Sequence, residues 1–175
     1  DAIGVEKGIE LMKAEGYQPA PWVTDMVASG NTSFYSIKDG ATHFYSITNK
    51  KVEKIPGQDA FIILNNIRES KKIWNNSDAI ITDLGDGIIN LEFTSKMNSI
   101  GAGVLQGINK AIDIAEKDYN GLVIGNQGAN FSVGANLGMI FMMAVEQEYD
   151  ELNMAIKMFQ DTMMRCRYSA IPVIA

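Results

Sequence analysis

Residues 121–137 constrain the fold of this chain more than any other segment. They read Gly-Leu-Val-Ile-Gly-Asn-Gln-Gly-Ala-Asn-Phe-Ser-Val-Gly-Ala-Asn-Leu. The apolar start is typical of a buried strand, the glycine- and asparagine-rich middle of a turn, and the residues that follow Asn136 of an amphipathic helix. A helix that starts directly after such a turn leaves its first backbone N–H groups without intrahelical acceptors. This order therefore predicts a place where backbone amides can stabilise a developing negative charge.

The residues around this segment predict an α/β unit. An apolar pair of strands encloses a Gly-Asp-Gly turn, which is a strong hairpin signal. A long amphipathic helix separates this hairpin from the strand at 121–124. The predicted elements, in order, are strands at 79–84 and 87–93, a helix at 97–118, a strand at 121–124, helices at 136–149 and 150–168, and a buried strand at 171–175.

The first part of the chain has a different pattern. Weak helical stripes at 5–15 and 22–28 precede two aromatic, alternating runs that flank Asp39-Gly40, which predicts a β-hairpin. His43 lies inside this hairpin, and we interpret it as a structural or exposed residue. Residues 49–57 are polar and close on Pro-Gly, as in a linker, and a helix is expected at 58–70. We therefore predict two domains, 1–57 and 58–175.

Composition and charge exclude several classes of protein. The 175 residues are 46% hydrophobic and 21% charged, which is typical of a globular protein. The net charge is −6 and the basic residues are scattered, so we expect no nucleic-acid partner. No apolar run approaches the roughly 20 residues that span a bilayer. One cysteine, Cys166, and one histidine form neither a disulfide nor a zinc site, so we expect a cytoplasmic protein with no metal.

The segment Phe131-Ser-Val-Gly-Ala-Asn-Leu137 closely resembles the first oxyanion-hole segment of the crotonase (enoyl-CoA hydratase/isomerase) superfamily, whose usual form is Phe-x-x-Gly-Ala-Asp-Leu. The resemblance implies that the Ala135 N–H is a catalytic donor to the carbonyl oxygen of a CoA thioester. It places Gly134, Asn136 and Leu137 in the substrate-binding wall, with glycine allowing close approach of the thioester. Asn136 departs from the usual Asp, and it is still able to cap the following helix.

Residues 94–100, Thr-Ser-Lys-Met-Asn-Ser-Ile, look like the first CoA-contact loop of the same family. By that resemblance, Lys96 and Met97 lie near the nucleotide end of CoA. Two simpler interpretations stay open: Asn98 and Ser99 cap the long helix, and Lys96 is a solvated lysine.

Residues 1–57 contain the two predicted helices, a Pro-Ala-Pro-Trp turn at 19–22 and a hairpin that opens with Ser-Gly-Asn-Thr-Ser-Phe-Tyr at 29–35. In this order they look like the tail of a 3-hydroxyacyl-CoA dehydrogenase C-terminal domain. The whole sequence therefore resembles a fragment of a fused dehydrogenase/enoyl-CoA hydratase of fatty acid metabolism. The implied fold is α/β: the N-terminal half of a crotonase (ClpP/crotonase-like ββα) domain, preceded by a small helical and β-hairpin segment. The implied activities are a lyase that hydrates enoyl-CoA and an oxidoreductase that uses NAD. The implied substrate is an acyl-CoA thioester, with no cofactor in this fragment, which alone is expected to be inactive.

Several points stay open at this stage. The four acidic residues of the helix–helix junction, Glu146, Glu148, Asp150 and Glu151, are interpreted as a solvated turn, so no general acid or base is assigned. The expected partners are an acyl-CoA, the rest of a longer chain and, in a homo-oligomer, further copies of the protein. Alternatives are a non-catalytic acyl-CoA-binding or assembly module, or another crotonase chemistry such as isomerisation or thioester hydrolysis. Cys166 lies between Arg165 and Arg167 on a methionine-rich helix and is interpreted as a packed thiol.

Overall fold

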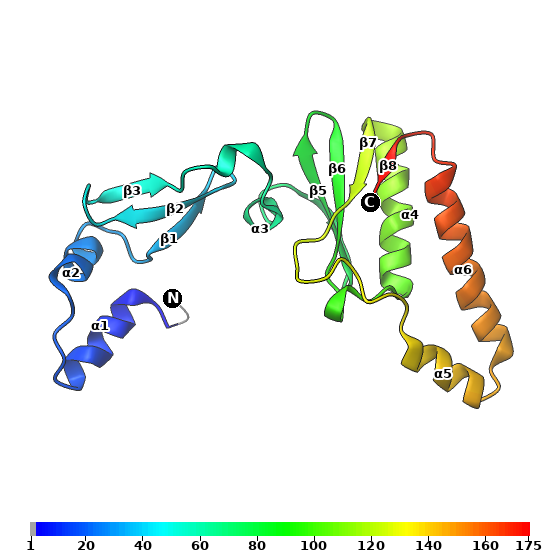
Figure 1. The fold of residues 1–175 in the computed structure, drawn as a ribbon, viewed down its shortest axis with the longest axis horizontal. Coiled ribbons are helices and arrows are strands. Elements are labelled where there is room, and N and C mark those ends of the chain that lie inside the picture. Colours follow the sequence, from blue (N-terminus) through cyan, green and yellow to red (C-terminus); the bar gives the residue numbers. More distant parts are fainter. Residues whose placement is uncertain (1–2) are drawn as a thin grey trace. The chain divides into compact units, whose positions relative to one another are not determined.

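A computed structural model of the chain describes residues 3–175 (Figure 1). The chain divides into two compact units between Asn66 and Ile67, and each unit has its own sheet and its own core. The sequence analysis placed a domain boundary after residue 57. In the described part of the chain, no helix combines the length and the apolar character needed to cross a membrane.

The first unit combines two helices with a three-stranded antiparallel sheet. Val5, Met26 and Tyr45 form its small buried core, and Trp22 packs against Phe34 with ring centroids 5.7 Å apart. The predicted hairpin is confirmed. The elements are α1 (Val5–Ala14), α2 (Pro21–Ala28), β1 (Tyr35–Lys38), β2 (Ala41–Ser46), β3 (Lys51–Lys54) and the 3-10 turn η1 (Gln58–Ala60).

The turn of this hairpin follows its sequence. Asp39 and Gly40 both have positive φ, 53° and 74°, as the two central residues of a tight turn that matches strand twist. Lys38 consequently pairs with Ala41, and Tyr35 with Phe44.

Two predictions for residues 49–70 were wrong. Residues 51–54, expected in a linker, form β3, which pairs antiparallel with β2. Residues 58–70, expected as one helix, contain only η1 and the single turn α3 (Leu64–Ile67). Phe61 and Ile62 supplied part of the apolar spacing, yet both are exposed. Apolar spacing predicts a helix only where a core covers the apolar face.

The second unit is built on a mixed five-stranded sheet in the order β4-β5-β6-β7-β8. The first three strands are antiparallel, whereas β6, β7 and β8 are parallel, so helices connect them. This α/β arrangement, which follows a small helical and β-hairpin unit in the sequence, confirms the predicted fold class. The elements are β4 (Lys72–Asn75), β5 (Ala79–Gly85), β6 (Ile88–Phe93), η2 (Lys96–Asn98), α4 (Ala102–Asp118), β7 (Gly121–Ile124), α5 (Leu137–Val145), α6 (Tyr149–Arg167) and β8 (Val173–Ile174).

The edge strand β4 was missed by the sequence analysis, which placed these residues beyond the end of a helix. It is short and begins with a lysine, features by which proteins protect the edges of sheets. Only its pairing with β5 reveals it as a strand.

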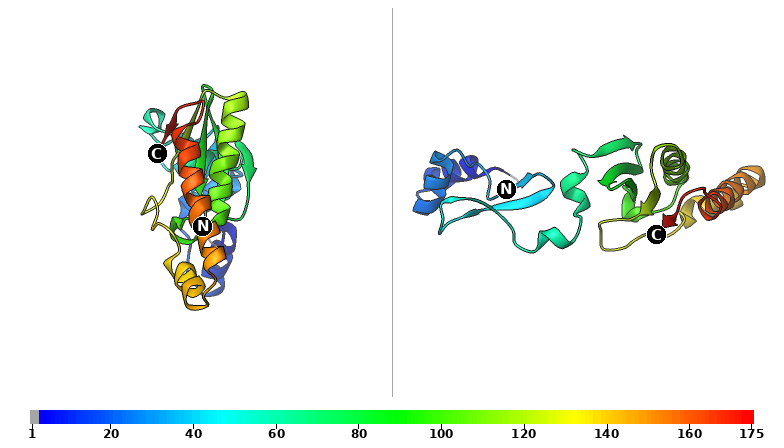
Figure 2. Two further views of the ribbon diagram at one scale, coloured as in Figure 1. Left: turned by 90° about the vertical axis from the view of Figure 1, so that its right-hand side faces the viewer. Right: turned by 90° about the horizontal axis from the view of Figure 1, so that it is seen from above.

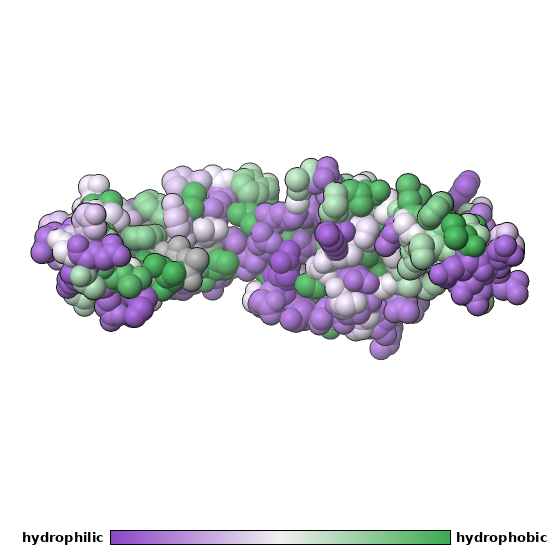
Figure 3. Space-filling view, turned by 90° about the horizontal axis from the view of Figure 1, so that it is seen from below, coloured by the Kyte–Doolittle hydropathy of each residue, from purple (hydrophilic) through white to green (hydrophobic). Residues whose placement is uncertain are grey.

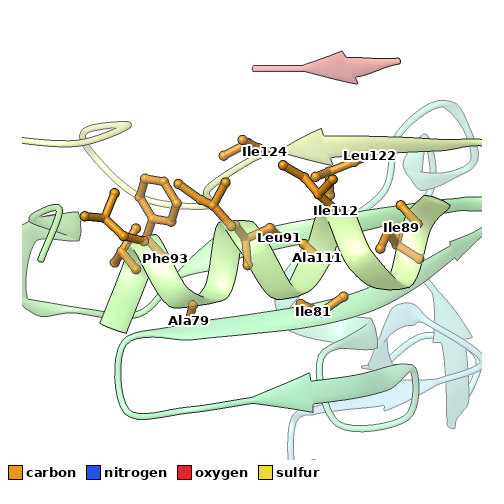
Figure 4. Close-up of a cluster of buried hydrophobic side chains, with 13 residues drawn as sticks. Ala79, Ile81, Ile89, Leu91, Phe93, Ala111, Ile112, Leu122 and Ile124 are labelled. Carbon is orange, nitrogen blue, oxygen red and sulfur yellow. The ribbon is translucent and has the colours of Figure 1, made fainter. Parts of the chain in front are cut away.

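The core of the second unit lies between α4 and the sheet. Figure 4 shows α4 running alongside the strands, with Ala111 and Ile112 facing Leu91 and Leu122. Gly107 permits the close approach, because a Cβ there would lie 2.7 Å from the Cβ of Ala79. Helices α4 and α6 run side by side in Figure 1 and in the left view of Figure 2. Across their contact, Asn109 Nδ2 donates to the buried Thr162 Oγ1 at 2.8 Å.

Candidate functional site

The two loops singled out in the sequence lie against each other. The β6–α4 loop (residues 94–101) and the β7–α5 loop (residues 125–136) leave the carboxyl ends of two neighbouring parallel strands. Leu91 pairs with Ile124, so the loops start at the same edge of the sheet. This edge is where open α/β sheets commonly bind ligands.

Side chains of the β7–α5 loop bind the backbone of strand β6 and of the β6–α4 loop. Asn126 Oδ1 accepts from the Phe93 N–H at 2.6 Å, while its Nδ2 donates to the Phe131 carbonyl at 2.7 Å. The Phe131 ring packs beside Phe93, with centroids 5.9 Å apart. Ser132 Oγ donates to the Asn98 carbonyl at 2.6 Å. The sequence analysis singled out neither Asn126 nor Ser132, although the asparagine-rich composition of the turn is a signal for such bonds.

The peptide between Gly134 and Ala135 is held on one side only. The Gly134 carbonyl accepts from the Ile100 N–H at 2.8 Å, and Ile100 and Ala135 form an isolated parallel bridge. Because the peptide is trans, the Ala135 N–H points away from Ile100. No acceptor for the Ala135 N–H is found among residues 3–175. The amide predicted as an oxyanion donor is therefore free to bind a ligand.

Gly134 has a conformational role of its own. Its φ is +83°, a left-handed conformation that glycine adopts at little cost. A Cβ at this position would meet no atom of the protein within 4 Å. Any steric requirement for glycine here therefore comes from a bound ligand, whereas the backbone requirement is already present in the chain.

The other predicted site residues surround this peptide. Asn136 caps α5 as predicted, with its Oδ1 accepting from the Met139 N–H at 3.2 Å. Leu137, the first residue of α5, is 75% exposed. Lys96 and Met97 lie exposed in η2, and Lys96 takes part in none of the ion pairs found in the described part of the chain.

The alternative that Asn98 and Ser99 cap the long helix was wrong. Helix α4 begins at Ala102 behind Gly101, which makes no side-chain cap, and not at Met97 as expected. Met97 and Asn98 have φ values of 56° and 54°, which are incompatible with a helical start. Asn98 Nδ2 instead donates to the Asn130 carbonyl at 3.0 Å, as a further link between the two loops.

An apolar cavity of about 340 Å³ opens next to the Ala135 peptide. Its lining comes from Ala135, from the start of α4, and from the facing sides of α5 and α6; it includes Ile100, Leu105, Ile140, Met158 and Phe159. No carboxylate lines it among the described residues. Other apolar side chains of α5 and α6, among them Phe141 and Met154, are exposed. In Figure 3, hydrophobic residues (green) are interspersed with hydrophilic ones (purple) on the visible face.

Glu92, Cys166 and His43, which lie outside the two loops, each have a structural environment that accounts for them. Glu92 is buried at the end of β6, and Arg68 donates to both of its carboxylate oxygens at 2.7 and 3.1 Å. We interpret this pair as structural. Burial raises the pKa of the Cys166 thiol, more than the charge of Arg165 lowers it, which agrees with the prediction of a packed thiol. His43 lies 3.1 Å (Nδ1) from the Ala41 carbonyl oxygen within its own hairpin.

Known proteins similar to this chain include a dehydrogenase and a protein of a fatty acid oxidation complex. Over 176 aligned residues, covering 100% of this chain, it is 42% identical to a probable 3-hydroxyacyl-CoA dehydrogenase of Bacillus subtilis. The chain is a homologue of part of this dehydrogenase. It is also 30% identical, over 73% of its length, to a protein of Rickettsia felis named as a candidate trifunctional enzyme of a fatty acid oxidation complex. The resemblance to enzymes of fatty acid oxidation that the sequence suggested is thereby confirmed.

The homology covers only part of each relative. The chain spans 22% of the length of the Bacillus protein and 18% of the Rickettsia protein. No protein-family profile matches it. Solved structures similar to it include enoyl-CoA hydratases from Polaromonas (22% identity, TM-score 0.49, 54% of this chain and 38% of that one) and Bacillus anthracis (17% identity, TM-score 0.48, 55% and 38%).

Proposed function

We propose that the Ile67–Ala175 unit forms the thioester-binding part of an enoyl-CoA hydratase site. The observation that carries this proposal is the unpaired Ala135 N–H beside an apolar cavity of about 340 Å³. In this role the amide donates to the thioester carbonyl oxygen of a trans-2-enoyl-CoA. The acyl chain enters the cavity, whose lining of aliphatic, methionine and aromatic side chains suits an apolar ligand.

Hydration of an enoyl thioester requires a hydrogen-bond donor at the thioester oxygen. When water adds across the double bond, an electron pair moves onto that oxygen, which becomes enolate-like in the transition state. A preorganised backbone N–H stabilises such a charge by about 3 kcal/mol. The apolar surroundings strengthen this interaction because they lower the local dielectric constant. Ala135 itself neither takes up nor releases a proton.

The remaining site residues bind and orient the substrate in this proposal. Lys96 and Met97 contact the nucleotide end of CoA, where the exposed ammonium group of Lys96 faces phosphates. Gly134, Asn136 and Leu137 form the wall along the thioester. Asn136 acts here through its cap on α5, because the cap fixes where the helix begins.

The proton-transfer groups of the reaction are proposed to lie outside the described residues. No described carboxylate lines the cavity, and hydration needs a general acid and base. We infer that the rest of a longer chain supplies them, together with an NAD-dependent 3-hydroxyacyl-CoA dehydrogenase activity that oxidises the hydration product. The whole is proposed to work in the cytoplasm, as a homo-oligomer or a single chain.

The lack of a described carboxylate in the cavity lining also favours a second candidate function. A thioester amide and an acyl cavity without carboxylates suffice for an acyl-CoA-binding module that has no turnover. Other reactions of CoA thioesters, such as isomerisation or thioester hydrolysis, also need an oxygen-binding amide, so Ala135 alone does not separate them from hydration.

The test uses the full-length gene product that contains this sequence. Hydration of crotonyl-CoA and longer trans-2-enoyl-CoA substrates is followed by loss of the enoyl-thioester absorbance, and binding of saturated acyl-CoA by calorimetry. Ala155→Trp fills the cavity and should weaken binding of long-chain acyl-CoA at least about tenfold, with little change for short chains. Met154→Trp changes an exposed neighbour on the same helix outside this cavity and is the matched control.

Each result distinguishes the candidates. Hydration that Ala155→Trp makes selective for short chains supports the hydratase. Acyl-CoA binding without turnover favours the binding module. Absence of both binding and turnover contradicts the assignment of this site.

A further inference from the structure

The Ser132 hydroxyl makes two hydrogen bonds that join the β6–α4 and β7–α5 loops. It donates to the Asn98 carbonyl oxygen at 2.6 Å and accepts from the Gly134 N–H at 3.0 Å. A hydroxyl has one proton to donate and two lone pairs, so both bonds form at once. The half-buried Ser132 side chain thus links Asn98, which lies 34 positions earlier in the chain, to Gly134, the residue that precedes the free amide.

Both peptide groups of Gly134 are fixed by this arrangement. Its N–H is bound by Ser132 Oγ, and its carbonyl by the Ile100 N–H at 2.8 Å. Glycine has an unusually wide choice of φ and ψ, so a peptide next to it rotates easily when its polar groups are not held. With both partners in place, the Ala135 N–H keeps one direction, away from Ile100.

Asn98 presents its carbonyl to Ser132 through an uncommon backbone conformation. Its φ is 54°, a left-handed value that asparagine tolerates better than most residues, and it follows Met97 at 56°. Its side-chain Nδ2 donates to the Asn130 carbonyl at 3.0 Å, two residues before Ser132. The two loops are therefore joined in both directions, from Asn98 to the β7–α5 loop and from Ser132 back to the β6–α4 loop.

We propose that Ser132 is a positioning residue: its hydroxyl, held by the Asn98 carbonyl, fixes the Val133–Gly134 peptide. Together with the Ile100 N–H on the Gly134 carbonyl, it thereby sets the direction in which the Ala135 N–H meets the substrate oxygen. This rests on the proposed function, in which that N–H binds the thioester carbonyl. Ser132 itself makes no contact with the reacting atoms. It acts before the substrate arrives, by preventing rotation of a glycine peptide that would turn the donor away.

The experiment compares Ser132→Ala with Ser132→Thr, which keeps the hydroxyl, in the full-length gene product. Ser169→Ala is the matched control, because the Ser169 hydroxyl also donates to a backbone carbonyl, that of Ile171 at 2.6 Å, away from the loops. For each variant, kcat and KM for crotonyl-CoA and the thermal midpoint are measured. Infrared spectroscopy of a bound, carbonyl-labelled butyryl-CoA reports the strength of hydrogen bonding to the thioester oxygen.

A positioning role predicts a split between these measurements. In Ser132→Ala, kcat falls about 10- to 100-fold, because a displaced donor no longer stabilises the transition-state charge. KM changes by less than about threefold, and the thermal midpoint shifts no more than in Ser169→Ala. The thioester carbonyl band moves back towards its position in water. Ser132→Thr keeps both the wild-type band and most of kcat.

Other results overturn the proposal, and they do so distinguishably. An active Ser132→Ala with an unshifted carbonyl band removes the positioning role and leaves the hydratase function intact. A large fall in the thermal midpoint and a parallel change in KM that Ser132→Thr fails to rescue assign Ser132 to folding only. A wild-type protein that binds acyl-CoA without hydrating it contradicts the hydratase, and the band alone then decides the role of Ser132. A wild-type protein that binds no acyl-CoA overturns both.

Discussion

The guanidinium of Arg165 donates to both carboxylate oxygens of Glu116, with N···O distances of 2.7 and 2.6 Å. This pair joins α6 to α4. Glu116 also accepts from the Ala170 N–H at 2.8 Å, which fixes the turn that leads into β8. One carboxylate on α4 therefore positions both the end of α6 and the approach to the edge strand.

This arrangement predicts a loss of stability in acid. The hydrogen bonds from Arg165 and Ala170 lower the pKa of Glu116 from 4.5 to about 2. A group whose pKa is lower in the folded state stabilises the fold above its unfolded pKa, and this contribution is lost as the pH falls through the folded pKa. The thermal midpoint of the wild-type protein should therefore decrease as the pH is lowered from 4.5 to about 2. Glu116→Gln should lower the midpoint at neutral pH and remove this part of the pH dependence.

The exposed pair between Lys157 and Asp161, at 2.8 Å, provides the control for this prediction. Exposed pairs four residues apart on a helix contribute only about 0.3–0.5 kcal/mol, so Asp161→Asn should change the midpoint little. Equal slopes of midpoint against pH in the wild type and in Glu116→Gln would show that Glu116 does not provide the effect.

A methyl group added at Gly107 should destabilise the second unit. Alanine normally stabilises a helix by about 0.5–1 kcal/mol over glycine. Here its Cβ would lie 2.7 Å from the Cβ of Ala79, which has no flexible side chain to move aside. Overpacking of this kind costs about 1–3 kcal/mol, so Gly107→Ala should be destabilising overall. Urea unfolding followed by the fluorescence of Trp74, in a Trp22→Phe background, measures this unit.

At Gly8, in α1, an added methyl group should instead stabilise the protein. No atom lies within 4 Å of a Cβ at this position. Gly8→Ala should therefore gain the usual helical stabilisation, measured through Trp22 fluorescence. A stabilising Gly107→Ala would contradict the tight contact between α4 and β5.

Substitutions at Gly134 separate its backbone role from its role in binding. Gly134→Ala forces a residue with a Cβ to adopt φ +83° and should cost about 1–2 kcal/mol of stability. Gly134→Asn should cost less, because asparagine tolerates this conformation. Both place a side chain where the thioester is proposed to approach, so both should lose most hydratase activity. Gly128→Ala, in the same loop, meets only ordinary contacts at 3.7 Å and beyond and should change little.

The measurements are thermal denaturation and crotonyl-CoA hydration on the same samples. A fully active Gly134→Asn would contradict the close approach of the thioester. Equal stability of the alanine and asparagine variants would contradict the left-handed conformation of Gly134.

The stability that the cap on α5 contributes should depend on a hydrogen-bond acceptor at position 136 rather than on the size of the side chain. Asn136→Ala removes the acceptor for the Met139 N–H and should cost about 1 kcal/mol. Asn136→Asp keeps an acceptor and adds a negative charge at the start of a helix, so its stability should equal or exceed that of the wild type. Thermal denaturation of the three proteins distinguishes these cases. An Asn136→Ala variant as stable as the wild type would show that the cap contributes nothing.

Local sequence predicted the elements whose conformation depends on neighbouring residues. The Asp39-Gly40 turn formed as expected, because both residues accept positive φ, and the strand at 121–124 was predicted with its observed bounds. The cap by Asn136 was also predicted, since its acceptor and donor lie three residues apart. In contrast, β3 and β4 were missed, because a short polar strand becomes visible only through its partner strand.

The same distinction divides the candidate site. The sequence alone determined that residues 131–137 form a turn with a free amide at the start of a helix, and that a second loop precedes the long helix. The tertiary structure decided that these loops touch. The bonds from Ser132 to Asn98 and from Ile100 to Gly134 join residues 34 positions apart, and they depend on the parallel pairing of β6 with β7. Such contacts leave no local pattern in the sequence, because their energy appears only when the sheet has brought the two loops together.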